Sequence, residues 1–386
     1  MRLQRQSVRD GGARRQLRSV ATFFAAVVTV IVLAAGSMWW FSAEGQRWSP
    51  SLTQSSTPCA GDIGMAPAWI LDATDADLAR DLDAARAAGA TRFRFDVDWS
   101  VVESAKGEFN WAPIDRLVQA VAAHGMRPLG VLAYTPAWAR PAGVGFPPGG
   151  AASHIAPANP SDFAAFAAQA ANRYADSIMD WEIWNEPNRA TFWSPAPDAA
   201  AYTQLLIAAS EAIRAVQPNA NVIAGALAPG ENHAAGEIDP VTFAQRIYEN
   251  GGQGAFNTLS IHPYTYPWMP TDPSTSSWST FQKIPRIRDV MVTHGDQGKQ
   301  MWITEFGAPT GSDSTSVTQD AQAAYIAAGI NEARKLGYVP VILIYAIRDS
   351  GTDPNDPEQN FGLLKQDFEP KPAYDVVRQL AGSSIC

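Results

Sequence analysis

The sequence predicts an α/β fold, a (β/α)8 TIM barrel preceded by one N-terminal transmembrane or signal helix. Short apolar runs alternate with helical stretches along most of the chain, which favours a parallel sheet covered by helices. Eight strand–helix units occur in about 325 residues, a size that fits a closed barrel better than an open sheet. Ahead of them, a charge-free run follows a basic N-terminus, as in helices that enter or cross a membrane.

The predicted strands are short and rich in apolar, β-branched and aromatic residues, as in "TRFRFD" and "PVILIYA". We expect them at 61–65, 91–96, 127–133, 178–184, 221–226, 257–262, 300–305 and 340–346. The stretches between them space their apolar residues for one face of a helix. We expect helices near 75–88, 113–124, 161–175, 198–216, 239–250, 281–294, 317–336 and 370–381.

The N-terminal part of the chain differs in character from the rest. Residues 1–19 contain six arginines and are expected to form a basic tail that stays in the cytoplasm. Residues 20–41 would make a helix of roughly 33 Å, long enough to act as a transmembrane signal anchor. Small residues at 34–37 leave cleavage of a signal peptide open as the alternative. Residues 42–58 are expected to be a linker, and 59–386 a barrel domain outside the cytoplasm, membrane-anchored or secreted.

The charge of the chain excludes some partners. Beyond residue 45 there are 23 basic and 36 acidic residues, so this part has a formal charge of −13. It has no basic run, which makes nucleic acid an unsuitable partner. The sequence also lacks a Gly-rich phosphate motif, and its five histidines and two cysteines show no metal-ligand spacing. We expect a monomer with no cofactor and no metal.

Two cysteines flank the predicted barrel. Cys59 lies just before the first predicted strand, and Cys386 just after the last predicted helix. In a closed barrel the last helix ends beside the start of the first strand, so the two residues would lie close together. Outside the cytoplasm they would be oxidised. We expect a Cys59–Cys386 disulfide, with two unrelated thiols as the alternative.

Two glutamates are expected to end strands at the barrel mouth, where the C-terminal ends of the strands meet. Glu186 ends the fourth predicted strand within "WEIWNEPN", and Glu305 ends the seventh within "WITEFG". Cleavage of a glycosidic bond needs two carboxyl groups, one as acid and one as nucleophile or base. Trp181, Trp184 and Trp193 would desolvate Glu186, which suits a general acid. The pair therefore predicts a glycoside hydrolase.

Other polar residues of the predicted strands are expected to support this pair. Glu305 would meet Arg94 and the hydroxyl of Tyr264, which would keep it ionised as the nucleophile. His262 ends the sixth strand and is expected to contact the substrate. Glu182 lies inside the fourth strand. We expect it to be structural, either buried beside an inward arginine or on the outer face of the strand.

The end of the fourth strand needs a local irregularity. Strict alternation cannot point both Asn185 and Glu186 into the mouth, but a bulge or a strand end at Asn185 can. Pro187 supports such a break because it cannot continue a ladder. Tryptophans in the loops above the strands are expected either to stack on sugar faces or to pack. They are Trp138, Trp193, Trp268 and Trp278.

These motifs resemble those of retaining glycoside hydrolases of clan A. "WEIWNEPN" and "WITEFG" are similar to the acid/base and nucleophile motifs of the clan. Three further runs resemble family 39 and its cellulase-like relatives: "RFDVDWSVVESAKGEFNWAPIDRLVQAVAAHGMRPLGVLAYTPAWA", "LSIHPY" and "FGLL…KPAYDVV". The resemblance spans about residues 60–381. It implies Glu186 as acid/base, Glu305 as nucleophile and Asn185 as the ligand of the sugar 2-hydroxyl. It also places three residues around the nucleophile: Arg94, His262 and Tyr264.

The sequence therefore predicts a retaining glycoside hydrolase that acts by double displacement on an extracellular or cell-wall oligo- or polysaccharide. Many clan members have a tryptophan platform at the end of the eighth strand. This chain offers Tyr345 there as the substrate-binding residue. Two alternatives stay open: a non-catalytic carbohydrate-binding barrel, and a transglycosylase that remodels surface glycan.

Overall fold

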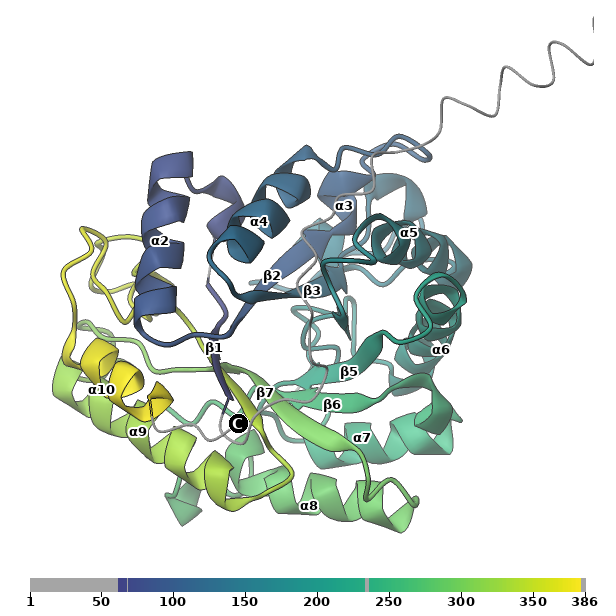
Figure 1. Cartoon of the computed structure of the whole chain (residues 1–386). Coiled ribbons are helices and arrows are strands. Elements are labelled where there is room, and N and C mark those ends of the chain that lie inside the picture. The colour runs from purple at the N-terminus through teal and green to yellow at the C-terminus, as the bar shows by residue number, and fades with distance from the viewer. Residues whose placement is uncertain (1–61, 68, 233–235, 383–386) are drawn as a thin grey trace, which may run out of the picture. The chain divides into compact units, whose positions relative to one another are not determined.

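A computed structural model describes residues 62–67, 69–232 and 236–382 of the chain. Eight parallel strands close into a barrel in which each strand pairs with its neighbours in chain order (Figure 1). The ring closes where β1 pairs with β8. The strands are β1 (Asp62–Met65), β2 (Arg92–Asp98), β3 (Arg127–Ala133), β4 (Asp180–Ile183), β5 (Asn221–Leu227), β6 (Thr258–Ile261), β7 (Gln300–Phe306) and β8 (Val341–Ile344).

Helices alternate with the strands along the chain and lie outside the sheet (Figure 1). The longer ones are α2 (Asp75–Ala87), α4 (Ala112–Ala123), α5 (Pro160–Arg173), α6 (Ala199–Val216), α7 (Pro240–Glu249), α8 (Thr280–Thr293), α9 (Gln319–Lys335) and α10 (Pro372–Ala381). Short α3 (Trp99–Val102) and several single turns lie in the loops. Most of the longer helices begin at a polar side chain that accepts a hydrogen bond from the first turn. These caps are Thr74, Asn159, Asp198, Asp239, Ser279 and Thr318.

The predicted alternation is confirmed, because each expected strand and helix overlaps one observed element. Three expectations fall outside the described residues: the helix at 20–41, the linker at 42–58 and the Cys59–Cys386 disulfide. Among the helices in the described ranges, none has the length and apolar character needed to cross a bilayer.

Alternation along β2 shows how the two faces of the sheet are used. Phe93, Phe95 and Val97 are buried and form part of the apolar layer between the barrel and its helices. Arg94 points the other way and reaches Glu305 of β7 across the interior. The hydrophobic effect therefore holds the helices on the outside of the sheet, while the inside of the barrel accommodates charge.

A layer of ion pairs fills the barrel near the N-terminal ends of the strands. Arg92 donates to Asp62 and lies 3.4 Å from Asp180. Arg127 donates to the same Asp62 across 2.7 Å. An unpaired charge here would be costly because it has lost its water. These pairs stabilise the barrel at the end opposite to the mouth.

Strand β7 contains one residue more than the matching part of β8. Their register shifts between Ile303 and Phe306, where three steps along β7 match two along β8. The extra residue interrupts strict alternation. As a result, Thr304 and Glu305 both contact residues inside the barrel, although they are neighbours in sequence.

Strand β4 ends at Ile183, and the chain then takes left-handed backbone angles. Trp184 has φ 71 and Glu186 has φ 46. Trp184 turns its indole to Phe163 and Trp193, away from the mouth. The break predicted near Asn185 is thus confirmed.

Candidate active site

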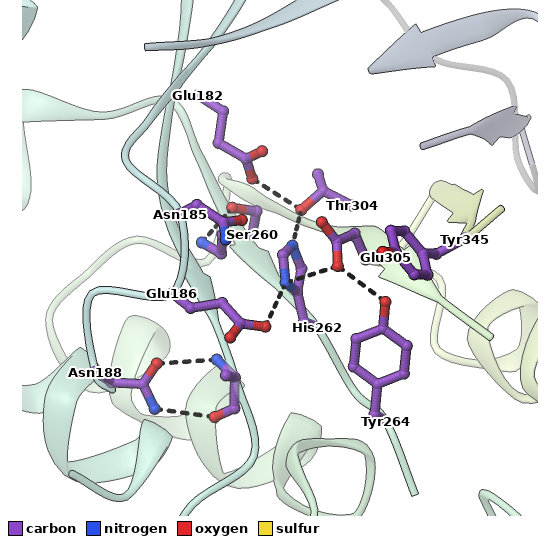
Figure 2. Close-up of polar contacts among 12 residues, drawn as sticks. Glu182, Asn185, Glu186, Asn188, Ser260, His262, Tyr264, Thr304, Glu305 and Tyr345 are labelled. Atoms are coloured by element: carbon purple, nitrogen blue, oxygen red, sulfur yellow. Dashed lines mark hydrogen bonds and ion pairs between the residues drawn. The ribbon is translucent and has the colours of Figure 1, made fainter. Parts of the chain in front are cut away.

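Glu186 and Glu305 lie together at the barrel mouth with His262 between them (Figure 2). One oxygen of each carboxyl and one ring nitrogen of His262 all lie within 4.8 Å of one another. Both glutamates are largely buried. The expectation that strands β4 and β7 bring two carboxyl groups together is confirmed.

Glu305 is held by two hydrogen-bond donors and lies beside His262. Arg94 donates from Nη1 to Oε1 across 2.5 Å, and the Tyr264 hydroxyl donates to Oε2 across 2.8 Å. Nδ1 of His262 lies 3.4 Å from the same Oε2. Burial raises the pKa of Tyr264 well above 10, and the charge of Glu305 raises it further, so the phenol keeps its proton and remains a donor. These contacts fix the orientation of the Glu305 carboxylate.

Arg94 distributes its donors among three site residues. Nε donates to Glu182 across 2.6 Å, and Nη2 donates to Oδ1 of Asn185 across 2.8 Å. Nη1 donates to Oε1 of Glu305. Burial alone would lower the pKa of Arg94, but Glu182, Glu305 and Asp96 raise it above its usual value. The guanidinium is therefore permanently charged and positions a carboxylate on each of two strands.

His262 makes the contact to Glu186. Its Nδ1 lies 3.0 Å from Oε1 of Glu186, and its Nε2 lies 3.1 Å from the hydroxyl of Thr304. The imidazole is 0% exposed. The expected direct contact between His262 and substrate therefore does not fit its position; it supports the carboxyl groups instead.

Thr304 continues this line of contacts downwards to Glu182, which it reaches across 2.8 Å (Figure 2). Burial raises the pKa of Glu182, but Arg94, His262 and a hydrogen bond from Ser260 lower it by more, so the net pKa lies below its usual value. Of the two positions open to Glu182 in the sequence, the structure shows the inward one beside an arginine.

Further carboxyl groups lie near the pair. Burial raises the pKa of Asp96 to about 7, and Arg94 offsets part of this rise. Burial also raises the pKa of Glu358, with a contribution from the charge of Glu305. Oε2 of Glu358 accepts from the Tyr345 hydroxyl across 3.2 Å. The mouth therefore combines acidic groups with few cations, which suits a neutral ligand better than an anionic one.

The sequence matches the family model for cellulase (glycosyl hydrolase family 5) over residues 41–342. The chain belongs to this glycoside hydrolase family. The expected relation to clan A and its cellulase-like members is confirmed by this match and by the structural neighbours.

Solved structures of similar fold include glycoside hydrolases of families 39 and 5. A family 39 glycoside hydrolase from Bacteroides cellulosilyticus WH2 has a TM-score of 0.66 and 27% identity, over 84% of this chain and 64% of that chain. A monomeric beta-xylosidase from Caulobacter crescentus CB15 has a TM-score of 0.64 and 20% identity, over 86% of this chain and 71% of that chain. A subfamily 18 member of family 5 from Streptomyces cattleya, in complex with GlcNAc, has a TM-score of 0.63 and 17% identity, over 84% and 80%. This family 5 chain thus spans less than two thirds of the first of these proteins.

The tryptophans near Glu186 in sequence do not surround it in this family 5 chain. Trp181 donates to Gln217 on the outer side of the sheet. Trp193 is only 2% exposed and packs against Trp184 and Tyr202. The expected desolvation of Glu186 by these indoles, and the expected stacking of Trp193 on sugar, are therefore wrong. The break after β4 turns this aromatic cluster towards the helices, and His262 is the partner of Glu186.

Two expected substrate-binding aromatics remain accessible. Trp138 is half-buried, donates to the Glu103 carbonyl across 2.9 Å, and has Lys106 over its ring. Tyr345 is half-buried beside Tyr264 and Phe361 at the end of β8. Stacking of these two rings on a sugar stays a prediction.

Two residues that shape the site were not expected. Thr304 lies on the inward face already set by Trp302, whose ring packs against Arg92, and the bulge adds Glu305 to the same face. The sequence gives no sign of that bulge. Asn188 accepts from Ala228 and donates to the carbonyls of Ala228 and Ile238, which pins the loop after β5 beside Glu186 (Figure 2). An amide just after a catalytic strand was the one available signal for Asn188.

Proposed function

We propose that this chain is a retaining glycosidase that cleaves glycosidic bonds by double displacement. The observation that carries the proposal is the spacing of the two carboxyl groups. An oxygen of Glu186 lies within 4.8 Å of an oxygen of Glu305. Retaining enzymes place these groups about 5–5.5 Å apart, whereas inverting enzymes need about 6.5–9.5 Å to admit a water.

The contacts assign a role to each carboxyl group. Glu305 attacks the anomeric carbon, because Arg94 and Tyr264 each donate to one of its oxygens and aim it. Glu186 protonates the leaving oxygen and then removes a proton from the water that releases the sugar. His262 lies within reach of Glu186 and can support both of its protonation states.

Asn185 is placed to recognise the sugar next to the bond that breaks. Arg94 occupies its Oδ1, and within the described part of the chain its Nδ2 makes no hydrogen bond. This amide is therefore free to donate to the sugar 2-hydroxyl. Tyr345, which is half-buried and packs edge-on against the buried Phe361, offers an aromatic surface at the end of β8. We propose a neutral oligo- or polysaccharide as substrate.

Product stereochemistry tests the proposal directly. Aryl glycosides of neutral sugars would be screened first, and proton NMR of the early product from an active one would then identify the anomer. We expect the first product to have the configuration of the substrate. An inverted product would remove Glu305 from the nucleophile role. No turnover across the panel would favour a non-catalytic carbohydrate-binding barrel. In methanol or with sugar acceptors, transfer products exceeding hydrolysis would indicate a transglycosylase.

We also propose that the barrel works outside the cytoplasm, anchored by or cleaved from the segment at 20–41. The charge-free length of this segment and its basic flank support this. Protease added to intact cells should digest the barrel of a tagged full-length chain, and washing with carbonate should leave an anchored form in the membrane. A chain protected in intact cells would contradict the proposal.

A further inference from the structure

A line of hydrogen bonds runs from the middle of the barrel to the proposed acid/base. It starts at Glu182 of β4, passes through Thr304 of β7 and His262 after β6, and ends at Glu186 (Figure 2). The three distances are 2.8, 3.1 and 3.0 Å in that order. Glu182, Thr304 and His262 are all inaccessible to solvent. In the proposed double displacement, Glu186 is the only residue of this line that takes part in a chemical step.

The positions of the protons along the line follow from the number of donors. Glu182 accepts from Arg94 Nε across 2.6 Å, and this pair keeps it ionised, so it can only accept. The single hydroxyl proton of Thr304 must then point to Glu182. The oxygen of Thr304 is left as an acceptor, which requires a proton on Nε2 of His262.

The other ring nitrogen then faces two carboxyl groups. Nδ1 lies 3.0 Å from Oε1 of Glu186 and 3.4 Å from Oε2 of Glu305. A lone pair on Nδ1 would repel two carboxylates. Glu305 already accepts from Arg94 and Tyr264, so it has no need of a proton. One proton must therefore lie between Nδ1 and Glu186, and it is the proton that a general acid delivers.

We propose that Glu182, acting through the Thr304 hydroxyl, is a positioning residue for this proton: it holds His262 protonated at Nε2, so that Nδ1 and Glu186 share one proton. The assignment rests on the proposed role of Glu186 as acid/base. The negative charge of Glu182 stabilises the protonated state of the pair and extends the general acid to higher pH. The titratable and charged groups around His262 come from several strands: Arg94, Glu182, Glu186, Tyr264 and Glu305.

Removing the Thr304 hydroxyl tests the line with little change in shape. In Thr304→Val, the basic limb of the pH profile of kcat/KM should move to lower pH by about one unit, a tenfold loss of proton affinity. Thr304→Ser keeps the hydroxyl and should keep the wild-type limb. Glu182→Gln, which removes the charge, should shift the limb in the same direction, and the double variant should shift it no further than the larger single effect.

A spectroscopic measurement tests the line independently of turnover. The 15N shifts of the His262 ring should show Nε2 protonated in the wild-type and Thr304→Ser proteins, and this preference should be lost in Thr304→Val. Identical ring shifts and identical basic limbs in Thr304→Val and wild type would overturn the proposal. The proposal would also be overturned if the basic limb moved equally in Thr304→Val and Thr304→Ser, because a change in packing would then explain the movement. If Thr304→Val does not fold, Glu182→Gln decides by the same two readouts. An enzyme inactive on every sugar would remove the proposed function, and the NMR comparison would still decide the proton position.

Discussion

Nη1 of Arg94 lies 2.5 Å from Oε1 of Glu305, so β2 holds a carboxylate of β7 across the interior of the barrel. The two strands are not neighbours in the sheet. A guanidinium can orient a carboxylate at a fixed angle, which a single ammonium cannot. The proposed nucleophile is thus aimed by a residue that is itself fixed by two other contacts.

Replacing Glu305 should remove the attacking group while keeping its shape. Glu305→Gln is expected to lower kcat by roughly a thousandfold or more on an activated aryl glycoside, because an amide is a poor nucleophile. Stopped-flow release of the aryl group measures this. Glu249→Gln, an exposed change at the end of α7, serves as the control and should match the wild type. Near-normal turnover by Glu305→Gln would assign the nucleophile to another residue.

Replacing Glu186 should separate the two chemical steps. In Glu186→Ala, hydrolysis of substrates with poor leaving groups should fall by about 10²–10⁴-fold, since these need a general acid. A dinitrophenyl glycoside needs little acid help, so its first step should stay fast and give a burst. Added azide should then restore turnover and yield a glycosyl azide of retained configuration. An equal loss on good and poor leaving groups would contradict the acid role.

The hydroxyl of Tyr264 should matter more than that of Tyr345. Tyr264→Phe removes a 2.8 Å bond to Oε2 of Glu305 and keeps the ring in place. Loss of a hydrogen bond to a charged group costs about 1.5–3 kcal/mol, so kcat/KM should fall by roughly 10–150-fold. Tyr345→Phe is the matched change, since its hydroxyl contacts Glu358 and not the nucleophile. It should act mainly on KM, and an equal fall in kcat for both variants would refute the distinction.

Asp96 should make the folded state less stable as pH rises. Burial raises its pKa to about 7 in the folded chain, from an ordinary value of 3.8. The folded state therefore binds this proton more tightly than the unfolded state. Its contribution is complete below about pH 4 and is lost as pH rises towards about 7 and above. Urea unfolding of wild type and Asp96→Asn at several pH values from 4 to 8 measures the difference. We expect the free energy of unfolding of the variant to fall less over this range, and parallel curves would exclude the effect.

The barrel could be predicted because its signals are local. Strand and helix periodicity, caps such as Asp198, and polar residues at strand ends each act over a few positions. The proximity of Glu186 and Glu305 followed from the same pattern, since parallel strands bring their C-terminal ends to one edge. The contact of Arg94 with Glu305 and that of Tyr264 with Glu305 were also foreseen.

The side of the sheet to which a side chain points could not be predicted where the backbone departs from strict alternation. Trp184 and Trp193 lie beside Glu186 in sequence, yet the left-handed angle at Trp184 sends that cluster to the helices. The inward position of Glu305 directly after the inward Thr304 depends on the pairing of β7 with β8, a relation between segments far apart in the chain. Neither the left-handed angle nor the register shift can be recognised from the types of the neighbouring residues.

The extra residue in β7 has a consequence for how variants of this enzyme are compared and built. An alignment that continues β7 as a regular strand from the inward Trp302 places position 305 on the helix side, and a library designed on that alignment would fill it with bulky apolar residues. Deleting one residue of β7 upstream of Glu305 would turn either Glu305 or its neighbour out of the barrel, although the sequence motif around Glu305 would remain. In this fold, catalytic competence therefore depends on the length of a strand as much as on its letters.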